Sequence, residues 1–133
     1  MRLVLDTDVC IWAVRARAPY LDRVLSYRPG ELGVAAMTVA ELEYGAIKSR
    51  DYAREWARYA EFLDAGIRVL PFEREAARVY ARLRHALRGQ PIGSADMEIA
   101  SVAVALDLPV ATNNAREFGR VPGLRVEDWS RAE

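Results

Sequence analysis

Four acidic side chains lie at the ends of predicted buried strands or in the first turns of predicted helices, and they are candidates for joint chemistry on a phosphate ester. Asp6 closes the first apolar run of the chain, and Glu41 lies one turn into the helix expected after the second. Asp96 begins a later helix, and Glu117 follows the last strong apolar run. Ligands of open parallel sheets bind beyond the carboxyl ends of the strands. These four carboxylates are therefore expected to share one site.

Converging carboxylates need a partner of opposite charge. Without Arg or Lys between them, the carboxylates repel one another and their pKa values rise until a cation neutralises them. Oxygen ligands alone favour hard ions, so the expected occupant is Mg²⁺, with Mn²⁺ as a possible substitute. Such an ion can orient a phosphodiester, lower the pKa of water and stabilise the leaving oxyanion. This chemistry needs no histidine, and His85 is the only histidine in the chain.

Each acid also has an ordinary structural interpretation. Asp6 has the type and position of a helix cap, and Thr38 with Glu41 has the spacing of a capping box. Asp96 would complement the dipole of its helix, and Glu117 taken alone is typical of a solvated surface. Only the shared position of the four acids after successive strands favours a common site.

Apolar runs and helical patterns alternate along the chain. This order predicts an α/β fold with a mainly parallel central sheet of four or five strands flanked by helices. Strands are expected over 2–6, 32–36, 67–70 and 108–112, with a fifth near Val126. Helices are expected over 9–14, 20–27, 38–48, 51–65, 73–87 and 96–106.

Length and composition limit the possible functions. The 133 residues fit one domain spanning residues 1–133, and a hydrophobic fraction of 52% supports a full core. Nineteen basic and nineteen acidic residues cancel, so bulk charge requires neither a nucleic acid nor a membrane. The single cysteine, Cys10, excludes an intrachain disulfide and cysteine-based metal sites. No apolar run or signal-peptide pattern points to a membrane, so a cytoplasmic location is expected.

Several segments resemble a known family when they are taken in order along the chain. The chain is similar to the PIN-domain ribonucleases, in particular to the VapC toxins of VapBC toxin–antitoxin pairs. The matching segments cover nearly the whole chain, and their ordered set is more specific than any one of them. They are LVLDTD at 3–8, TVAELEYG at 38–45, PIGSADMEIA at 91–100, TNNAREF at 112–118, VPGL at 121–124 and EDW at 127–129.

The resemblance implies a metal-dependent endoribonuclease that is inhibited by a cognate VapB-type antitoxin and forms a homodimer. Position by position, Asp6, Glu41 and Asp96 match the metal-binding acids, and Glu117 matches a more variable fourth acid. The expected reaction is RNA hydrolysis that leaves 5′-phosphate and 3′-hydroxyl ends. The implied substrate is transfer RNA cut in the anticodon region, with initiator tRNA as one candidate.

Four further residues are expected to support the acids. Thr7, Thr112 and Asn114 lie beside them in the matching segments and carry polar side chains. Asp8 departs from the family, which usually has Asn at this position, and it adds negative charge next to the first acid. Glu117 departs as well, because the family more often has the shorter Asp there, which leaves direct binding of a second metal ion open.

Arginines are candidates for contacts with RNA. Arg50, Arg54 and Arg58 are spaced by four residues in a predicted helix, so they would line one face. Acidic residues lie nearby in the sequence, and a solvated face of mixed charge is the competing interpretation.

Two alternative functions remain open at this stage. The segment Asp6–Asp8 followed by valine resembles the nucleophile motif of haloacid-dehalogenase-type phosphatases, in which the first Asp attacks phosphorus. Against a phosphatase, Lys48 is the only lysine and no later Asp–Asp motif occurs. The third hypothesis is a catalytically silent module of the PIN type that binds RNA or a partner protein.

Overall fold

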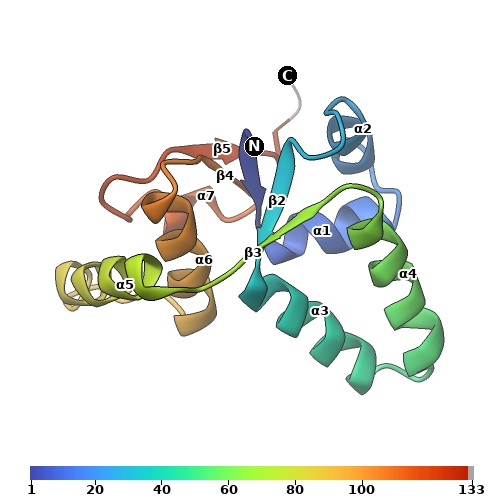
Figure 1. Cartoon of the computed structure of the whole chain (residues 1–133), viewed down its shortest axis with the longest axis horizontal. Helices are drawn as coiled ribbons and strands as arrows, with labels where there is room; N and C mark the ends of the chain where they lie inside the picture. The colour runs from blue at the N-terminus through green and yellow to red at the C-terminus, as the bar shows by residue number, and fades with distance from the viewer. Residues whose placement is uncertain (132–133) are drawn as a thin grey trace.

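A central sheet with its strands all parallel organises the computed structural model, which describes residues 1–131 (Figure 1). The strand order is β3-β2-β1-β4-β5. The strands are β1 Leu3–Leu5, β2 Leu32–Ala35, β3 Arg68–Leu70, β4 Val110–Thr112 and β5 Val126–Asp128. The helices are α1 Thr7–Val14, α2 Tyr20–Leu25, α3 Ala36–Lys48, α4 Tyr52–Asp64, α5 Arg74–Ala86, α6 Ser94–Ala105 and α7 Ala115–Phe118.

The order of the strands places β1 at the centre. The chain leaves β1 toward β2 and β3 on one side, and β4 and β5 then pair on the other side. Strand order therefore reverses at β1, and in open α/β sheets this switch point is where a crevice forms beyond the carboxyl ends. Because β1 is parallel to both of its neighbours, the residues that follow Leu5, Ala35 and Thr112 lie along the same edge of the sheet.

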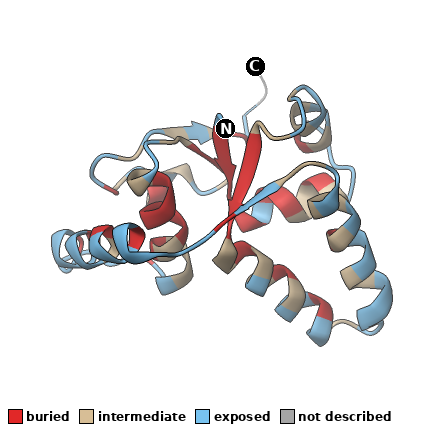
Figure 2. Cartoon of the chain, viewed as in Figure 1, coloured by how far each residue is buried: buried red, intermediate tan, exposed pale blue. Residues whose placement is uncertain are grey.

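Each face of the sheet is covered by its own group of helices. Successive side chains of a strand point to opposite faces. Leu3 and Leu5 pack in one cluster with Cys10 of α1, whereas Val4 packs in the other with Val102 of α6. Figure 2 shows the central strands buried along their length between these two groups. Burial on both faces explains why the strand sequences are continuously apolar instead of alternating.

The predicted α/β architecture is confirmed, with five strands, and several boundaries differ from expectation. Helix α3 begins at Ala36, so Thr38 lies inside the helix and the predicted capping box is wrong. Its N-terminal neighbour Ala35 is extended and makes no side-chain cap. Helix α4 begins at Tyr52, so Arg50 lies before the helix, although it was expected within it.

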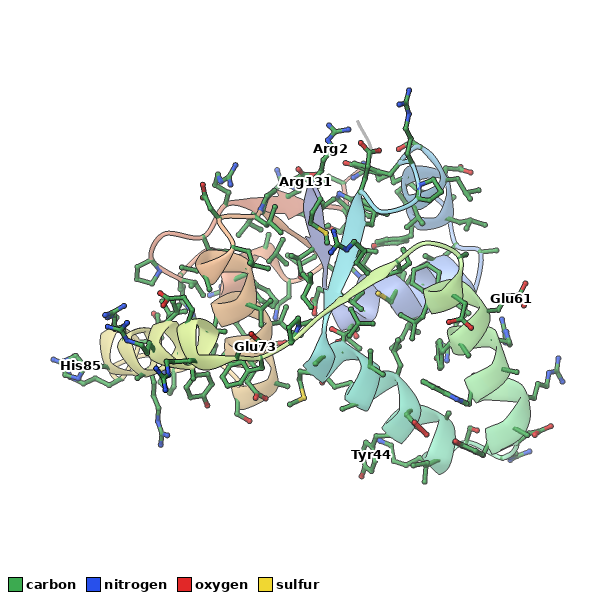
Figure 3. The ribbon with its side chains drawn as sticks, viewed as in Figure 1. Arg2, Tyr44, Glu61, Glu73, His85 and Arg131 are labelled. Atoms are coloured by element: carbon green, nitrogen blue, oxygen red, sulfur yellow. The ribbon has the colours of Figure 1, made fainter. Side chains whose placement is uncertain are left out.

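None of the helices in residues 1–131 is long and apolar enough to cross a lipid bilayer. The single histidine, His85, lies on the exposed surface near the end of α5, and its side chain points away from the sheet (Figure 3). The chemistry of the central crevice therefore depends on carboxylates, hydroxyls and amides.

Candidate functional site

Asp6 is fixed at the carboxyl end of β1 by two hydrogen bonds. Its Oδ1 atom accepts the backbone N–H of Thr7 at 2.7 Å, which makes Asp6 the N-cap of α1. Its Oδ2 atom accepts the hydroxyl of Thr112, the last residue of β4, at 2.8 Å. The backbone N–H of Asn114 donates in turn to the Thr112 hydroxyl at 2.8 Å. Asp6 is thus a helix cap and also a buried carboxylate held between two central strands, with 5% of its surface exposed.

Thr7 connects the first strand to Glu41. The Thr7 hydroxyl donates to Oε1 of Glu41 at 2.6 Å, and it shares a second hydrogen bond of 3.1 Å with the hydroxyl of Thr38. Because Thr7 has a single O–H, which the carboxylate accepts, Thr38 supplies the proton of the second bond. Helix α3 carries both Thr38 and Glu41, and its first turns therefore aim Glu41 at the end of β1.

Asp96 lies in the first turn of α6, half-buried and close to the other acids. The pKa of Asp96 is raised to about 7; burial is the largest cause, followed by the negative charges of Asp6, Glu117, Glu41 and Asp8 in that order. Charges separated by more than about 10 Å are largely screened at ordinary salt concentration. Asp96 therefore lies within range of the charges of the other four acids.

The pKa of Asp6 is also raised, to about 6. Burial is the largest cause, the hydrogen bonds from Thr112 and Thr7 lower the pKa in part, and the charges of Asp8 and Glu41 raise it. Burial is the main cause of both raised pKa values and the neighbouring acids add to it, so a bound cation would stabilise the charged forms of both carboxylates.

Glu117 is held by two hydrogen bonds at the edge of the site. Its Oε1 atom accepts the backbone N–H of Gly93 at 3.0 Å, and its Oε2 atom accepts the side-chain amide of Asn114 at 2.7 Å. Gly93 is the N-cap of α6, the helix that carries Asp96. Glu117 therefore connects the short helix α7 to the loop that positions Asp96.

Asp8 is exposed on α1, beside the buried acids. It contributes to the raised pKa values of both Asp6 and Asp96, so its extra charge does act on the site. The haloacid-dehalogenase hypothesis gains no support, because the ammonium of Lys48, the sole lysine, lies 4.5 Å from the centre of the Tyr44 ring near the far end of α3.

The residues present fit a hard divalent cation. Within residues 1–131, the acids of the site form no ion pair with Lys or Arg, and their polar surroundings consist of oxygen and amide groups. In the same part of the chain, no three or more His, Cys, Asp or Glu side chains lie in an arrangement that could by itself hold a metal ion. Mg²⁺ commonly keeps several waters and binds through one or two carboxylates, so an open arrangement is compatible with it.

Only two of the three arginines predicted to line one helix face lie on that helix. Arg54 and Arg58 lie exposed on α4, whereas Arg50 lies in the turn before it. Arg58 pairs with Glu55 at 3.5 Å, which matches the mixed-charge interpretation for this part of the series. Their role in RNA binding stays a prediction.

Sequence reasoning missed the role of Thr38. Its side chain is completely buried and hydrogen-bonded to Thr7. Threonine is uncommon at a fully buried position unless its hydroxyl has a partner. The sequence did carry one signal for this role: Thr38 lies one turn before Glu41 in an apolar helix.

Comparison with known proteins agrees with this fold. The family model of the PIN domain matches residues 3–124. The tRNA(fMet)-specific endonuclease VapC of Shigella flexneri is 36% identical over 132 residues, which cover 98% of this chain and 99% of that protein. Ribonuclease VapC2 of Rickettsia felis is 30% identical over 135 residues, which cover 98% of this chain and 100% of that protein. The DNA-bound VapBC structure from Salmonella typhimurium superposes with a TM-score of 0.90 at 34% identity, covering 97% of this chain and 98% of the other.

The chain therefore belongs to the PIN domain family, within its VapC group of ribonucleases. PIN-domain nucleases are generally dependent on divalent metal ions. This membership confirms the resemblance that the sequence segments indicated, and it favours a nuclease over the phosphatase alternative.

Proposed function

We propose that the protein is the toxin of a type II toxin–antitoxin pair and an Mg²⁺-dependent endoribonuclease formed by a single domain over residues 1–133. The observation that carries the proposal is that Thr7 connects Asp6 to Glu41 at the carboxyl end of β1, within range of the charge of Asp96, and that none of these acids pairs with Lys or Arg among residues 1–131. Membership of the VapC group supports it.

Asp6, Asp96 and Glu41 are the residues that would hold the ion, and Glu117 completes the acidic rim of the site. When bound, the ion would orient the scissile phosphate, favour deprotonation of water and stabilise the leaving oxygen. The surrounding hydroxyls keep the carboxylates in place: Thr112 holds Asp6, and Thr7 holds Glu41.

The protein groups also provide for movement of a proton. Oε1 of Glu41 is engaged by Thr7, and we assign its Oε2 atom as the acceptor for a proton of the attacking water. In-line attack on phosphorus then expels the 3′-oxygen of the preceding nucleotide and leaves 5′-phosphate and 3′-hydroxyl ends. The 2′-hydroxyl takes no part in bond breaking, so selection of RNA depends on contacts with its shape and bases.

The names of the relatives suggest the substrate and the partner. The Shigella flexneri relative is named for tRNA(fMet), and solved relatives are complexes of VapB with VapC. We propose by extension that the substrate of the present chain is a transfer RNA, cleaved in the anticodon region. We also propose that a VapB-type antitoxin inhibits the chain. We also propose that the protein forms a homodimer and is located in the cytoplasm.

The test uses purified protein and initiator tRNA with mapping of the cleaved ends. Wild type with Mg²⁺ should cut the tRNA and leave 3′-hydroxyl ends, whereas excess EDTA, Asp6→Ala or Asp96→Ala should abolish the cut. Cyclic 2′,3′-phosphate ends, or full cleavage in EDTA, would contradict the proposed mechanism. Absence of RNA cleavage by wild type under all metal conditions would leave only the catalytically silent alternative.

A further inference from the structure

We propose that a cavity beside the acidic site binds one unpaired nucleotide of the RNA substrate by stacking its base. The inference rests on the proposed function and names a second contact for the same substrate. The cavity has a volume of about 270 Å³ and lies between α5 and the start of α6. It is lined by Tyr80, Arg84, Pro91, Ile92, Ser94 and Met97.

The cavity and the acidic site are built from the same short segment. Ser94 and Met97 line the cavity, and Asp96 lies between them in the first turn of α6. Gly93 in the preceding loop donates its N–H to Glu117, and a side-chain atom built on Gly93 would lie 3.9 Å from Oδ2 of Asp96. The cavity and the acids therefore share the loop at Gly93 and the first turn of α6, so a nucleotide in the cavity would belong to the same strand as the scissile phosphate.

Tyr80 provides an aromatic surface in the cavity. Its ring is half-buried, is packed against the core, and meets the ring of Phe72 edge to face at a centroid distance of 6.0 Å. This contact fixes the tilt of Tyr80 before any ligand binds. Ile92 and Met97 add a buried apolar floor. A fixed ring over an apolar floor is suited to a flat nucleobase, because stacking on an aromatic side chain accepts every base.

The charge around the cavity favours a polyanion. Between Glu75 and Asp96 the chain carries four arginines and no acidic residue. Arg84 lies in the wall of the cavity, and its guanidinium can pair with a phosphate of the bound strand. Arg84 and the first turn of α6, which carries Asp96, line or border the same cavity, so a strand held by Arg84 can extend toward the acids.

The test measures binding without cleavage. A fluorescein-labelled single-stranded hexaribonucleotide containing 2-aminopurine is titrated with protein in EDTA, by anisotropy and by quenching of the 2-aminopurine. We expect Tyr80→Leu to weaken binding about 10-fold and to abolish the quenching, because a stacked base is lost. Arg84→Gln should lower the slope of log affinity against log salt concentration by about 0.7, the value for one phosphate of a single strand.

Matched variants separate this site from general effects. Tyr80→Phe keeps the stacking surface and should bind within about twofold of wild type. Arg125→Gln removes one arginine at the other end of the sheet, where Arg125 pairs with Asp107 at 3.2 Å, and should bind like wild type. Arg84 is exposed, so Arg84→Gln tests the site even if Tyr80→Leu fails to fold.

The outcomes distinguish this inference from the proposed function. If wild type binds and cuts RNA while Tyr80→Leu and Arg84→Gln match it in affinity, quenching and salt slope, the cavity is not a nucleotide site. Loss of binding to a VapB-type antitoxin with unchanged RNA binding would assign the cavity to the protein partner and overturn the inference. If wild type neither binds nor cuts RNA, both the proposed function and the inference are wrong.

Discussion

The hydroxyl of Thr112 donates a 2.8 Å hydrogen bond to Oδ2 of Asp6, joining residues 106 positions apart at the ends of two adjacent strands. Both side chains are buried, and Thr112 is completely so. The bond lowers the pKa of Asp6, against the larger effect of burial. Thr112 therefore keeps the central carboxylate of the site both fixed in direction and closer to its charged form.

Loss of the Thr112 hydroxyl should weaken metal binding. Thr112→Val removes the donor to Asp6 at nearly constant volume, so the pKa of Asp6 should rise further and its oxygen should lose its orientation. Groups that orient metal ligands typically contribute 10- to 100-fold in affinity. Calorimetric titration with Mn²⁺ at pH 7 should show a loss of about 10-fold. Thr112→Ser keeps the hydroxyl and should bind like wild type; equal loss in both variants would contradict this role.

Thr38 should affect turnover through Thr7 and Glu41. Thr38→Val removes the buried hydroxyl that bonds to Thr7, which leaves Glu41 less well aimed. We expect kcat for RNA cleavage to fall about 10-fold, the effect of about 1.4 kcal/mol on a barrier, with KM unchanged. Thr38→Ser should restore kcat. A change in KM alone, or no rescue by Ser, would show that Thr38 acts only through packing.

Stability should depend on pH because both Asp6 and Asp96 have raised pKa values, about 6 and about 7. The folded protein then binds protons more tightly than the unfolded chain does. The free energy of unfolding is highest at low pH and falls as pH rises from about 4 to about 7. In EDTA we expect a loss of about 3 kcal/mol from buried Asp6, with a further contribution from half-buried Asp96 that solvent screening reduces.

Urea unfolding in EDTA at pH 5 and pH 8 measures this pH dependence. The variants Asp6→Asn and Asp96→Asn should each be more stable than wild type at pH 8 and should show a flatter pH profile. Addition of Mg²⁺ at pH 8 should stabilise wild type and have little effect on the variants. If the free energy of unfolding of wild type instead rises from pH 5 to pH 8 in EDTA, these two acids do not control the pH dependence of stability.

Glu117 should order the loop before α6. Its two hydrogen bonds connect the Gly93 N–H and the Asn114 side chain, and Glu117→Ala removes both. The amide of Gly93 should then exchange with solvent at least about 10-fold faster, because the net value of such a bond to a charged group is about 1.5–3 kcal/mol. Hydrogen exchange measured by nuclear magnetic resonance checks this directly.

Metal titration separates this role from direct ligation. Glu117→Gln keeps an acceptor for the Gly93 N–H and should bind Mn²⁺ more tightly than Asp96→Asn does. If Glu117→Gln loses as much affinity as Asp96→Asn while the Gly93 amide remains protected, Glu117 is a direct ligand instead.

Most of the fold and the list of acids could be predicted from the sequence, for a physical reason. Strands buried on both faces require continuous apolar runs, and helices with one buried face require helical spacing, so both leave clear patterns. The resemblance to the family then indicated which of the many acidic residues belong to the site. The parallel pairing that brings the ends of β1 and β2, and with them Asp6 and Glu41, to one edge follows from the alternation of strands and helices.

The finer parts of the site could not be predicted because they depend on tertiary contacts. The hydrogen bond between Thr7 and Thr38 joins positions 31 apart, and in the sequence Thr38 looks like an ordinary helix cap. The start of α3 at Ala36 makes no side-chain cap, so no local signal marked it. The two bonds of Glu117 depend on where the loop at Gly93 lies relative to α7.

Direct titration of the purified protein with Mn²⁺, followed by electron paramagnetic resonance at pH 7.5, tests the central claim that these acids form one cation site. Wild type should bind the ion, and Asp6→Asn or Asp96→Asn should each weaken binding at least about 10-fold. The exposed acid Glu61 lies on α4 with its side chain turned outward (Figure 3), so Glu61→Gln should bind like wild type. Equal affinity in wild type and both Asn variants would contradict the account.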